Sequence, residues 1–336
     1  MSTSTFKAVI LAGGSGERFW PLSTPERPKQ FLRVFGGASL IRQAVSRLDG
    51  LVSPKDVFVV TAKNLVAATR KELPEIPKCN ILGEPMRRDT GAAVALGVGL
   101  AASDADPVIG FFSSDQMVSN PKAFRKVVSK AVAIARRKQV IVTLGIKPTY
   151  PATCFGYISP KTRTFVEKPD AKTAKKYVKA GYLWNAGMFI ARASTFRGAF
   201  AAHAPELERL TSSTRAAGSK APSTKHLFAL YSKLPKISFD YAVMEKSKNV
   251  EVVPGDFGWD DVGSFAAFDK YFPHDSRGNV REGPCTVVEA DGNICVARSA
   301  RISLLGVKNL VVVTTPDSVL VADKSRLTDM KKLFKK

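Results

Sequence analysis

The sequence is poor in the residues from which metal clusters and disulfide frameworks are built. Its 336 residues include only four cysteines and three histidines. The cysteines, Cys79, Cys154, Cys285 and Cys295, have no CxxC spacing and no histidine partner at zinc-finger spacing. A zinc site and a disulfide framework are therefore disfavoured, and we expect reduced thiols in a cytoplasmic protein.

Long apolar runs are also missing. No apolar stretch reaches the roughly 18 residues that a membrane-spanning helix needs. The run Ala8–Ala12 is too short for the apolar region of a signal peptide, and glycines follow it instead of a cleavage site. We therefore expect no membrane partner.

Acidic residues are outnumbered, with 29 Asp and Glu against 51 Lys and Arg, a formal net charge of +22. Such a charge favours anionic partners, among them nucleic acids and small phosphorylated substrates. The basic residues are spread along the chain, however, and no nucleic-acid recognition motif or aromatic–basic strip is present. We expect no nucleic-acid partner.

Up to about residue 145, short β-branched runs alternate with helical patterns. The strand-like runs are 7–12, 56–61, 107–112 and 139–144, and the helical patterns are 39–48, 64–72, 91–103 and 121–136, the third capped by Asp89 or Thr90. Strands alternating with helices favour a doubly wound, mostly parallel α/β sheet. Ligands of such sheets bind at the carboxyl ends of the strands.

The rest of the chain divides at about residue 278. Residues 150–275 are less regular and are interpreted as part of the same domain, with 212–224 as a polar loop. Closely spaced strand-like runs follow, and the chain ends in a basic helical pattern, Leu327 to Lys336. We predict a catalytic domain over 1–277 and a small β-rich domain over 278–336.

A glycine-rich turn follows the first strand, in Leu11-Ala-Gly-Gly-Ser-Gly-Glu-Arg-Phe-Trp-Pro-Leu. Glycines let backbone N–H groups approach phosphate oxygens closely. The Gly-Lys-Ser/Thr of a P-loop is absent, and Phe19 stands where a dinucleotide fingerprint needs its third glycine. Arg18 and, farther along, Lys29 add two cations that suit a triphosphate, although surface ion pairs are the alternative for both.

The pattern Leu-x-Gly-Gly-x-Gly-x-Arg-x-x-Pro-Leu and the later Pro-Lys resemble the sugar-1-phosphate nucleotidyltransferases. Further segments are similar to the mannose-1-phosphate guanylyltransferases within that family: Glu84-Pro-Met-Arg-Arg-Asp-Thr, Phe155-Gly-Tyr-Ile, Phe165-Val-Glu-Lys-Pro, Trp184-Asn-Ala-Gly-Met-Phe, Asp240-Tyr-Ala-Val-Met-Glu-Lys and Trp259-Asp-Asp-Val-Gly. The resemblance implies a Rossmann-like catalytic domain, a β-rich C-terminal domain, and the synthesis of GDP-mannose from GTP and mannose 1-phosphate. A homodimer is also expected.

The resemblance implies a magnesium-dependent attack of the sugar phosphate on the α-phosphorus of GTP. Arg18 and Lys29 would hold the β- and γ-phosphates. Asp115 follows a buried strand at its carboxyl end, where a carboxylate suits Mg²⁺, with a helix N-cap as the alternative. Asp261 would be the second metal ligand by resemblance, and neighbouring Asp260 competes for that role.

The expected nucleotide site comprises Leu11, Ala12, Gly13, Gly14, Gly16, Glu17, Arg18, Lys29, Glu84 and Pro85. Within it Glu84 is the candidate for base choice, because a carboxylate can accept hydrogen bonds from both N1–H and N2–H₂ of guanine. For the sugar, Glu167 would bind hydroxyls and Lys168 would neutralise the 1-phosphate. Gly156 and Asn185 resemble the family's sugar contacts.

The sequence departs from the family at two places. Gln116 follows Asp115 where a histidine is usual, which puts any role of that histidine in doubt, and Gly91-Ala92 replaces the usual Ala-Pro, which would loosen the loop beside the base. No cupin-type extension is present, so we expect no phosphomannose isomerase activity. A thymidylyl- or uridylyltransferase and a silent nucleotide-sugar-binding regulator remain alternatives.

Overall fold

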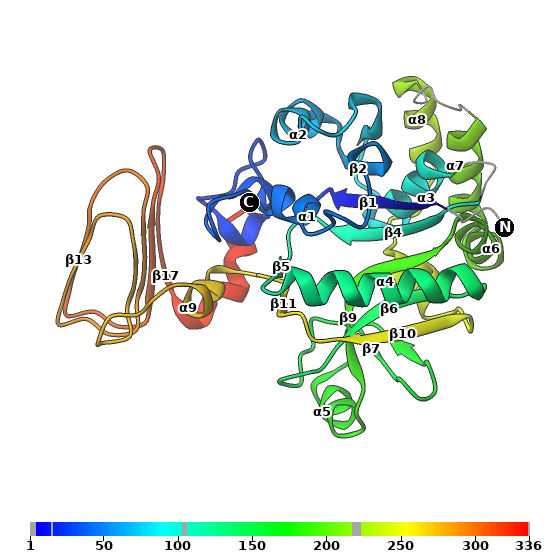
Figure 1. Ribbon diagram of the computed structural model, residues 1–336. Helices are drawn as coiled ribbons and strands as arrows, with labels where there is room; N and C mark the ends of the chain where they lie inside the picture. Colours follow the sequence, from blue (N-terminus) through cyan, green and yellow to red (C-terminus); the bar gives the residue numbers. More distant parts are fainter. Residues whose placement is uncertain (1–4, 15, 103–105, 217–222, 335–336) are drawn as a thin grey trace. The chain divides into compact units, whose positions relative to one another are not determined.

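The computed structural model describes residues 5–14, 16–102, 106–216 and 223–334, which form two compact units (Figure 1). The first unit takes in residues 5–13, 42–114 and 118–259, and the second takes in 14–41, 115–117 and 260–334. Each unit is described by itself. The units interleave along the chain, and the domain division at 277 and 278 stays a prediction.

The first unit is built on a nine-stranded sheet. Its main path runs in the order β10 (Val250–Gly255), β6 (Ile141–Ile146), β9 (Leu183–Arg192), β4 (Val108–Ser113), β1 (Phe6–Ala12), β2 (Val57–Ala62) and β3 (Ile81–Glu84). The strands β1 to β4 are mutually parallel, and β9 runs antiparallel between β4 and β6. The short strands β7 (Tyr157–Ile158) and β8 (Phe165–Val166) extend from β9. The doubly wound, mostly parallel fold is confirmed.

Helices accompany this sheet in the expected alternation. They are α1 (Leu40–Ser46), α2 (Val66–Glu72), α3 (Asp89–Ala101), α4 (Pro121–Arg137), α5 (Ala171–Lys179), α6 (Ala193–His203), α7 (Pro205–Ala216) and α8 (Thr224–Tyr231). The third helix begins at Asp89 with Arg88 at its cap position, so the expected cap at Asp89 or Thr90 was wrong. Among the described residues, no helix combines the length and apolar character that a membrane crossing requires.

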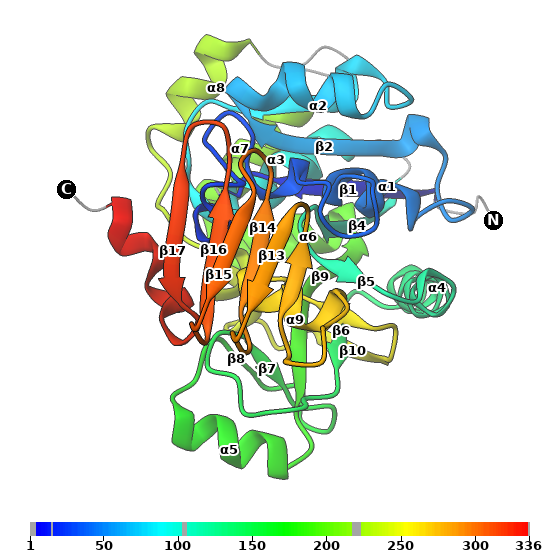
Figure 2. The ribbon, with the colours of Figure 1, turned by 90° about the vertical axis from the view of Figure 1, so that its left-hand side faces the viewer.

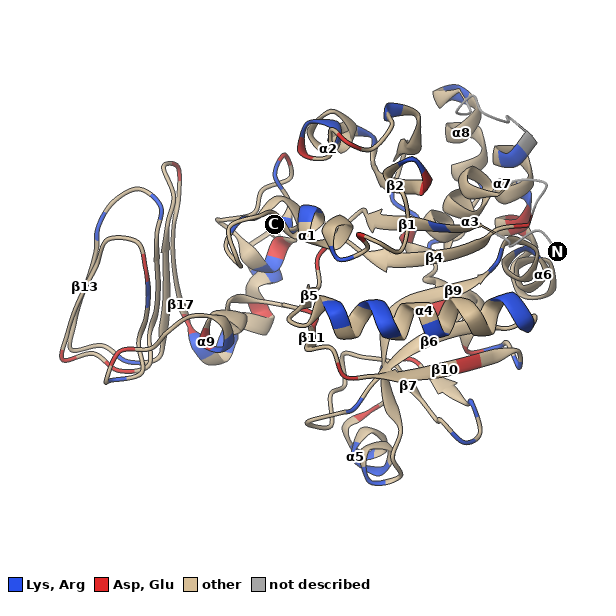
Figure 3. Ribbon diagram, viewed as in Figure 1, with Lys and Arg blue, Asp and Glu red and all other residues tan. Residues whose placement is uncertain are grey.

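The helix α4 shows how the basic residues are placed. Asn120 caps it by accepting a hydrogen bond from Ala123 N at 3.0 Å, and Phe124 and Val128 lie on its buried face. Its opposite face carries Lys122, Lys126, Lys130, Arg136 and Arg137, all exposed (Figure 3). The excess positive charge here is solvated helix surface.

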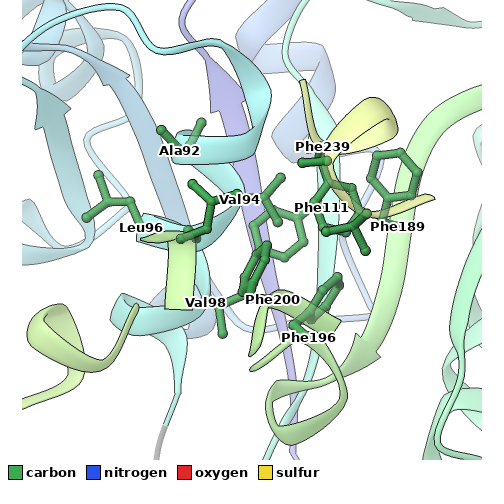
Figure 4. Packing of buried hydrophobic residues seen from close by; sticks show 14 of the residues in the cluster. Ala92, Val94, Leu96, Val98, Phe111, Phe189, Phe196, Phe200 and Phe239 are labelled. Atoms are coloured by element: carbon green, nitrogen blue, oxygen red, sulfur yellow. The ribbon is translucent and has the colours of Figure 1, made fainter. Parts of the chain in front are cut away.

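The helix α3 packs in the centre of the core of the first unit. Ala92, Val94, Leu96 and Val98 pack with Phe111, Phe189, Phe196, Phe200 and Phe239 (Figure 4). A Cβ at Gly99 would lie 2.6 Å from Thr214 Cβ, so α7 approaches α3 closely. Residues 212–216, predicted as loop, belong to α7, and Thr214 in this stretch contacts α3. Of the rest of that predicted loop, 217–222 lie outside the described residues, Ser223 caps α8 and Thr224 begins it, so the loop prediction was wrong at both ends.

The second unit contains the β-rich C-terminal strands (Figure 2). One sheet has the order β12 (Val280–Glu282), β14 (Ile294–Ala297), β16 (Leu310–Thr314) and β17 (Val319–Asp323), and the other pairs β13 (Cys285–Val288) with β15 (Ile302–Leu305). All pairs are parallel except β16 with β17. The helix α9 (Phe268–Tyr271) comes before these strands in the chain, and a 3₁₀ helix, Lys324–Phe334, follows them. The β-rich character predicted for this region is confirmed.

A second core joins these strands to the segment after the glycine loop. Phe19 and Phe35 pack with Phe265 and Phe268, and strand residues such as Val296 complete the cluster. Two short strands, β5 (Met117–Val118) and β11 (Trp259–Asp260), pair where the chain passes from one unit to the other. The core therefore fixes the residues that follow the glycine loop within the second unit.

The close approach of α3 to the sheet can be tested at Gly97. A Cβ there would lie 2.7 Å from Phe111 Cε1 and 2.8 Å from Val9 Cγ1. Gly97→Ala should therefore lower the free energy of unfolding by about 1–3 kcal/mol through overpacking. In the control Gly198→Ala, within α6, the Cβ meets no atom within 4 Å, and alanine should raise that free energy by roughly 0.5–1 kcal/mol. Chemical denaturation measures both, and equal effects would contradict the packing described.

Candidate active site

A pocket of about 470 Å³ opens at the carboxyl ends of β1, β2 and β3 in the first unit. It is lined by Gly13, Ala62, Lys63, Asn64, Glu84, Pro85, Met86 and Arg87. The pocket lies where parallel α/β sheets bind ligands. Three of the expected nucleotide-site residues, Gly13, Glu84 and Pro85, meet in it.

Glu84, the last residue of β3, is mostly buried in this pocket. Its Oε1 accepts a hydrogen bond from the hydroxyl of Tyr231 at 3.2 Å, and its Oε2 lies 3.3 Å from the position that a Cβ on Gly13 would take. Burial raises the pKa of Glu84 to about 7, and the hydrogen bond from Tyr231 lowers it in part. Sequence reasoning missed Tyr231, because it comes from α8, beyond the segment interpreted as a loop.

Backbone contacts hold the glycine loop and the start of α3. Leu11 and Ala12 end β1, and their carbonyls accept hydrogen bonds from Ser114 N and Thr61 Oγ1, both at 3.0 Å. Gly91 N donates to Ile237 O at 3.1 Å, and a Cβ at Gly91 would lie 2.7 Å from that oxygen. Glycine permits this close contact, and the loosening expected at Gly91-Ala92 stays a prediction.

In the second unit the loop is locked against Lys29. Gly16 has φ +64°, and a Cβ there would lie 2.5 Å from Lys29 N, so only glycine fits. Ser23 Oγ donates to Gly16 O at 2.6 Å. Glu17 and Arg18 follow in a 3₁₀ turn, Glu17–Phe19. Gly14 lies beside Asp115, with 4.0 Å between the position of its Cβ and Asp115 Oδ2.

The cations and carboxylates expected to handle phosphates meet in the second unit. Lys29 is 5% exposed, and its Nζ donates to Asp115 Oδ2 at 3.0 Å and to the backbone oxygen of Asp261 at 2.7 Å. Arg18 Nη1 and Asp261 Oδ2 lie 3.1 Å and 3.3 Å from the position of a Cβ on Gly263. Burial raises the pKa of Asp261, and the charge of Lys29 opposes that shift. The surface alternative for Lys29 is wrong.

The structure bears on two alternatives that the sequence leaves open: Asp260 in place of Asp261 as a metal ligand, and Asp115 as a helix N-cap. Asp260 is engaged elsewhere, because its carboxylate accepts hydrogen bonds from Val262 N at 2.7 Å and Lys270 Nζ at 2.6 Å. Asn120, not Asp115, caps α4. Lys29 therefore contacts the Asp115 carboxylate and the Asp261 backbone, and Asp261 as metal ligand in preference to Asp260 stays a prediction. Within the described ranges, no three His, Cys, Asp or Glu side chains gather so as to hold a metal by themselves, so an ion here needs substrate oxygens.

The residues expected to bind the sugar meet in the first unit. Lys168 Nζ lies 2.9 Å from Glu167 Oε1. Burial alone would lower the pKa of Lys168, but the hydrogen bond and charge of Glu167 raise it. A Cβ on Gly156 would overlap Glu167 Oε2, so a side chain there would displace the Glu167 carboxylate from its present position. Asn185 N donates to Gly156 O at 2.8 Å.

Asp240 joins this cluster. The segment that begins with Asp240 resembles the family, but the sequence predicts no role for this residue. It begins a π-helical turn, Asp240–Met244, and its Oδ1 accepts a hydrogen bond from Asn185 Nδ2 at 2.9 Å. Asn185 Oδ1 in turn accepts from Thr143 Oγ1 at 2.7 Å and Gly187 N at 3.1 Å. The side chain of Asn185 thus mainly holds Asp240. Burial, and then the charge of Glu167, raise the pKa of Asp240 to about 7.

Comparison with known proteins agrees with this architecture. Residues 7–277 match the family model described as nucleotidyl transferase, and residues 283–336 match the MannoseP isomerase/GMP-like beta-helix domain. The chain belongs to the nucleotidyl transferase family.

Individual relatives narrow this assignment. The mannose-1-phosphate guanylyltransferase of Escherichia coli (strain K12) is 34% identical, over 99% of this chain and 73% of its own length, and RfbM of Salmonella typhimurium is 35% identical, over 98% and 72%. A structure titled mannose-1-phosphate geranyltransferase, from Thermus thermophilus, superposes with a TM-score of 0.89 at 34% identity and covers 98% of both chains. Within its family the chain is a member of the mannose-1-phosphate guanylyltransferases.

The raised pKa of Asp240 predicts a pH-dependent effect on stability. The folded chain retains the Asp240 proton between its ordinary pKa of 3.8 and about 7, whereas the unfolded chain loses it, so stability falls as the pH rises through that window. Asp240→Asn should therefore raise the free energy of unfolding relative to the unmodified chain at pH 8, and raise it less at pH 4.

Glu251→Gln is the control of opposite sign. Burial would raise the pKa of Glu251, but hydrogen bonds from Lys138 at 2.8 Å and Arg163 at 2.9 Å lower it. Its contribution is present above its ordinary pKa of 4.5 and disappears as the pH falls through the lowered value. This variant should lose stability at pH 8 and little at low pH. Urea titrations at several pH values would refute the assignment if both variants responded alike.

Proposed function

We propose that this chain transfers a guanylyl group from GTP to mannose 1-phosphate with the help of Mg²⁺ and forms GDP-mannose and pyrophosphate. The observation that carries the proposal is the meeting of Arg18, Lys29, Asp115 and Asp261 in one unit. Two cations and two carboxylates suit a reaction in which one phosphate attacks another. The identity of the nucleotide and of the sugar is taken from the names of the relatives described above.

The chemistry requires positioning more than proton transfer. The sugar phosphate has a second pKa near ~6 and is largely a dianion at neutral pH, so it attacks without a general base. A bond forms between its oxygen and the α-phosphorus, and the bond from that phosphorus to the bridging α–β oxygen breaks, which releases pyrophosphate. Fixed cations that match the developing charge provide the rate enhancement.

The site residues of the second unit that are named above each have a role in this step. Arg18 and Lys29 bind the β- and γ-phosphates and neutralise the departing pyrophosphate. Asp115 and Asp261 would hold Mg²⁺, because the Asp115 carboxylate contacts Lys29 and the Asp261 carboxylate lies within reach of the charges of Lys29 and Asp115. When bound, the ion neutralises phosphate charge and orients the phosphates. Gly14 and Gly16 keep the loop backbone open to the phosphates.

The residues of the first unit select the substrates. Glu84 accepts hydrogen bonds from guanine N1–H and N2–H₂, and the pocket of about 470 Å³ has room for a base. Glu167 accepts hydrogen bonds from sugar hydroxyls, and Lys168 neutralises the sugar phosphate. Asn185 acts through Asp240, which it holds beside Glu167.

Pyrophosphate release tests the reaction and its substrates together. GTP, ATP, UTP and dTTP are each supplied with mannose 1-phosphate or glucose 1-phosphate. We expect release with GTP and mannose 1-phosphate only. Glu84→Gln replaces one of two acceptor oxygens with an amide N–H₂, which is a donor, so the KM for GTP should rise at least about tenfold with a smaller change in kcat. Release with other pairs would overturn the substrates, and none at all from folded protein would overturn the reaction.

Aspartate variants test the metal assignment. Asp115→Asn and Asp261→Asn should each weaken the dependence on Mg²⁺ by at least about tenfold, because each loses a charged ligand. Asp260→Asn is the matched control, since Lys270 and Val262 already occupy that carboxylate. A Mg²⁺ titration of activity compares the three, and a larger loss in the Asp260 variant would reverse the assignment.

We also propose that the chain forms a homodimer and works in the cytoplasm. Leu305, Val319 and Val321 are 72%, 63% and 63% exposed on strands of the second unit, which supports association through that face. The four cysteines, all within the described ranges, are free thiols, as suits a reducing compartment. Sedimentation should give twice the chain mass for the unmodified protein and a smaller mass for Val321→Glu.

A further inference from the structure

Tyr231 ends α8 with its side chain completely buried. It is 0% exposed, and its hydroxyl reaches the pocket side of β3, where it donates to Glu84 Oε1 at 3.2 Å. Burial, and then the charge of Glu84, raise the pKa of Tyr231 well above 10, so the phenol stays protonated and remains a donor. A buried phenol needs such a partner, and here the partner is the carboxylate expected to read the base.

The end of α8 is held by the same segment that carries Glu84. Arg88 Nε donates to Tyr231 O at 2.8 Å, and Arg88 Nη2 donates to Ser232 O at 3.1 Å. The guanidinium thus binds the last carbonyls of the helix, where a cation is favoured. Glu84 ends β3 and Arg88 directly precedes α3, so one short connection carries both the carboxylate expected to read the base and the anchor for α8.

The two carboxylate oxygens of Glu84 therefore differ. Oε1 is occupied on one side by the tyrosine hydroxyl, and Oε2 faces the backbone at Gly13. The hydroxyl fixes the rotation of the carboxylate plane, while lone pairs on both oxygens stay available to two parallel N–H donors. A carboxylate free to rotate would satisfy one donor as easily as two.

We propose that Tyr231 is a positioning residue for base selection: anchored by Arg88, its hydroxyl orients Glu84 so that the carboxylate binds N1–H and N2–H₂ of guanine together. The inference rests on the proposed function, because it concerns the site that would bind GTP. Its chemical consequence is selection for the 2-amino group. Hypoxanthine, which has N1–H and no 2-amino group, is the base that reveals it.

The same hydroxyl affects how nucleotide binding depends on pH. Donors on the base favour the ionised form of Glu84, so GTP affinity should fall as the pH drops through the pKa of about 7. The hydroxyl lowers this pKa, so its removal should move the fall in affinity to higher pH. Besides Tyr231, the charged groups around Glu84 are Asp89 at the start of α3, Lys63 after β2 and Arg87 after β3.

The experiment compares GTP with inosine triphosphate in the whole protein, from pH 6 to pH 9. The unmodified chain should prefer GTP by roughly ten- to a hundredfold in kcat/KM. Tyr231→Phe should lower that preference at least about fivefold, chiefly through KM for GTP, and should move the pH midpoint of GTP affinity upwards. Titration of the nucleotide phosphates is the same for both proteins and cancels in the comparison. Glu84→Gln should show no such midpoint.

Two further variants separate positioning from loss of stability. Arg88→Met leaves Glu84 and the phenol in place and removes the anchor of α8, so it should lower the preference for GTP in the same direction. Thr69→Val removes another buried hydroxyl, which donates to Leu65 O at 2.8 Å within α2, and should leave the preference and the pH midpoint unchanged.

The outcomes distinguish the two proposals. If the unmodified chain forms no GDP-mannose from GTP, the proposed function fails whatever Tyr231 does. If it forms GDP-mannose and Tyr231→Phe keeps both the preference for GTP and the pH midpoint, Tyr231 has no positioning role. If Thr69→Val changes the preference as much as Tyr231→Phe does, the effect is one of stability, and the positioning role is again refuted.

Discussion

The buried ammonium of Lys29 is the contact around which the second unit is organised. It binds the Asp115 carboxylate and the Asp261 carbonyl, and these three residues come from three separate stretches of chain, within 14–41, 115–117 and 260–334. One cation therefore determines where the stretches meet. Its loss would leave carboxylates without a matching charge in a mostly buried place, which costs more than the ion pair itself contributes. Gly16 belongs to the same constraint, because any side chain there would displace Lys29.

Two buried acids of the first unit accept hydrogen bonds from neutral groups, in contrast to the pairing of Asp115 with Lys29. Glu84 and Asp240 face neutral donors, a phenol and an amide, and burial raises the pKa of both to about 7. Neutral partners leave these carboxyl groups close to losing or gaining a proton, which suits groups that must accept hydrogen bonds from a ligand. The described acids of the second unit that face Lys29 thus have a cationic neighbour, whereas Glu84 and Asp240 accept hydrogen bonds from neutral groups. A buried acid whose negative charge has no cationic partner lowers the stability of the folded protein. Such a cost is common where a residue is kept for binding.

Local patterns were sufficient to predict β1, β2, β4 and β6 of the sheet and the positions of several candidate site residues at strand ends, but not the antiparallel β9. Strands in a parallel sheet are buried on both faces and appear as continuous apolar runs, so β1, β2, β4 and β6 were found within about two residues. Residues directly after such strands, among them Asp115, follow from the same rule. Tyr231 could not be predicted, because it meets Glu84 across 147 residues and nothing near it in sequence marks the contact. Asp240 was missed for the same reason, since its partner Asn185 lies on β9.

The last strand of the C-terminal sheet, β17, runs antiparallel to its neighbour β16. The strands β12, β14 and β16 are parallel to one another, and β17 has the opposite direction because it pairs antiparallel with β16. The parallel pairing therefore ends at β16 within this chain. A strand added beyond β17 in the direction of β12 would have to pair with it antiparallel, so a second copy cannot continue the parallel pattern at that edge.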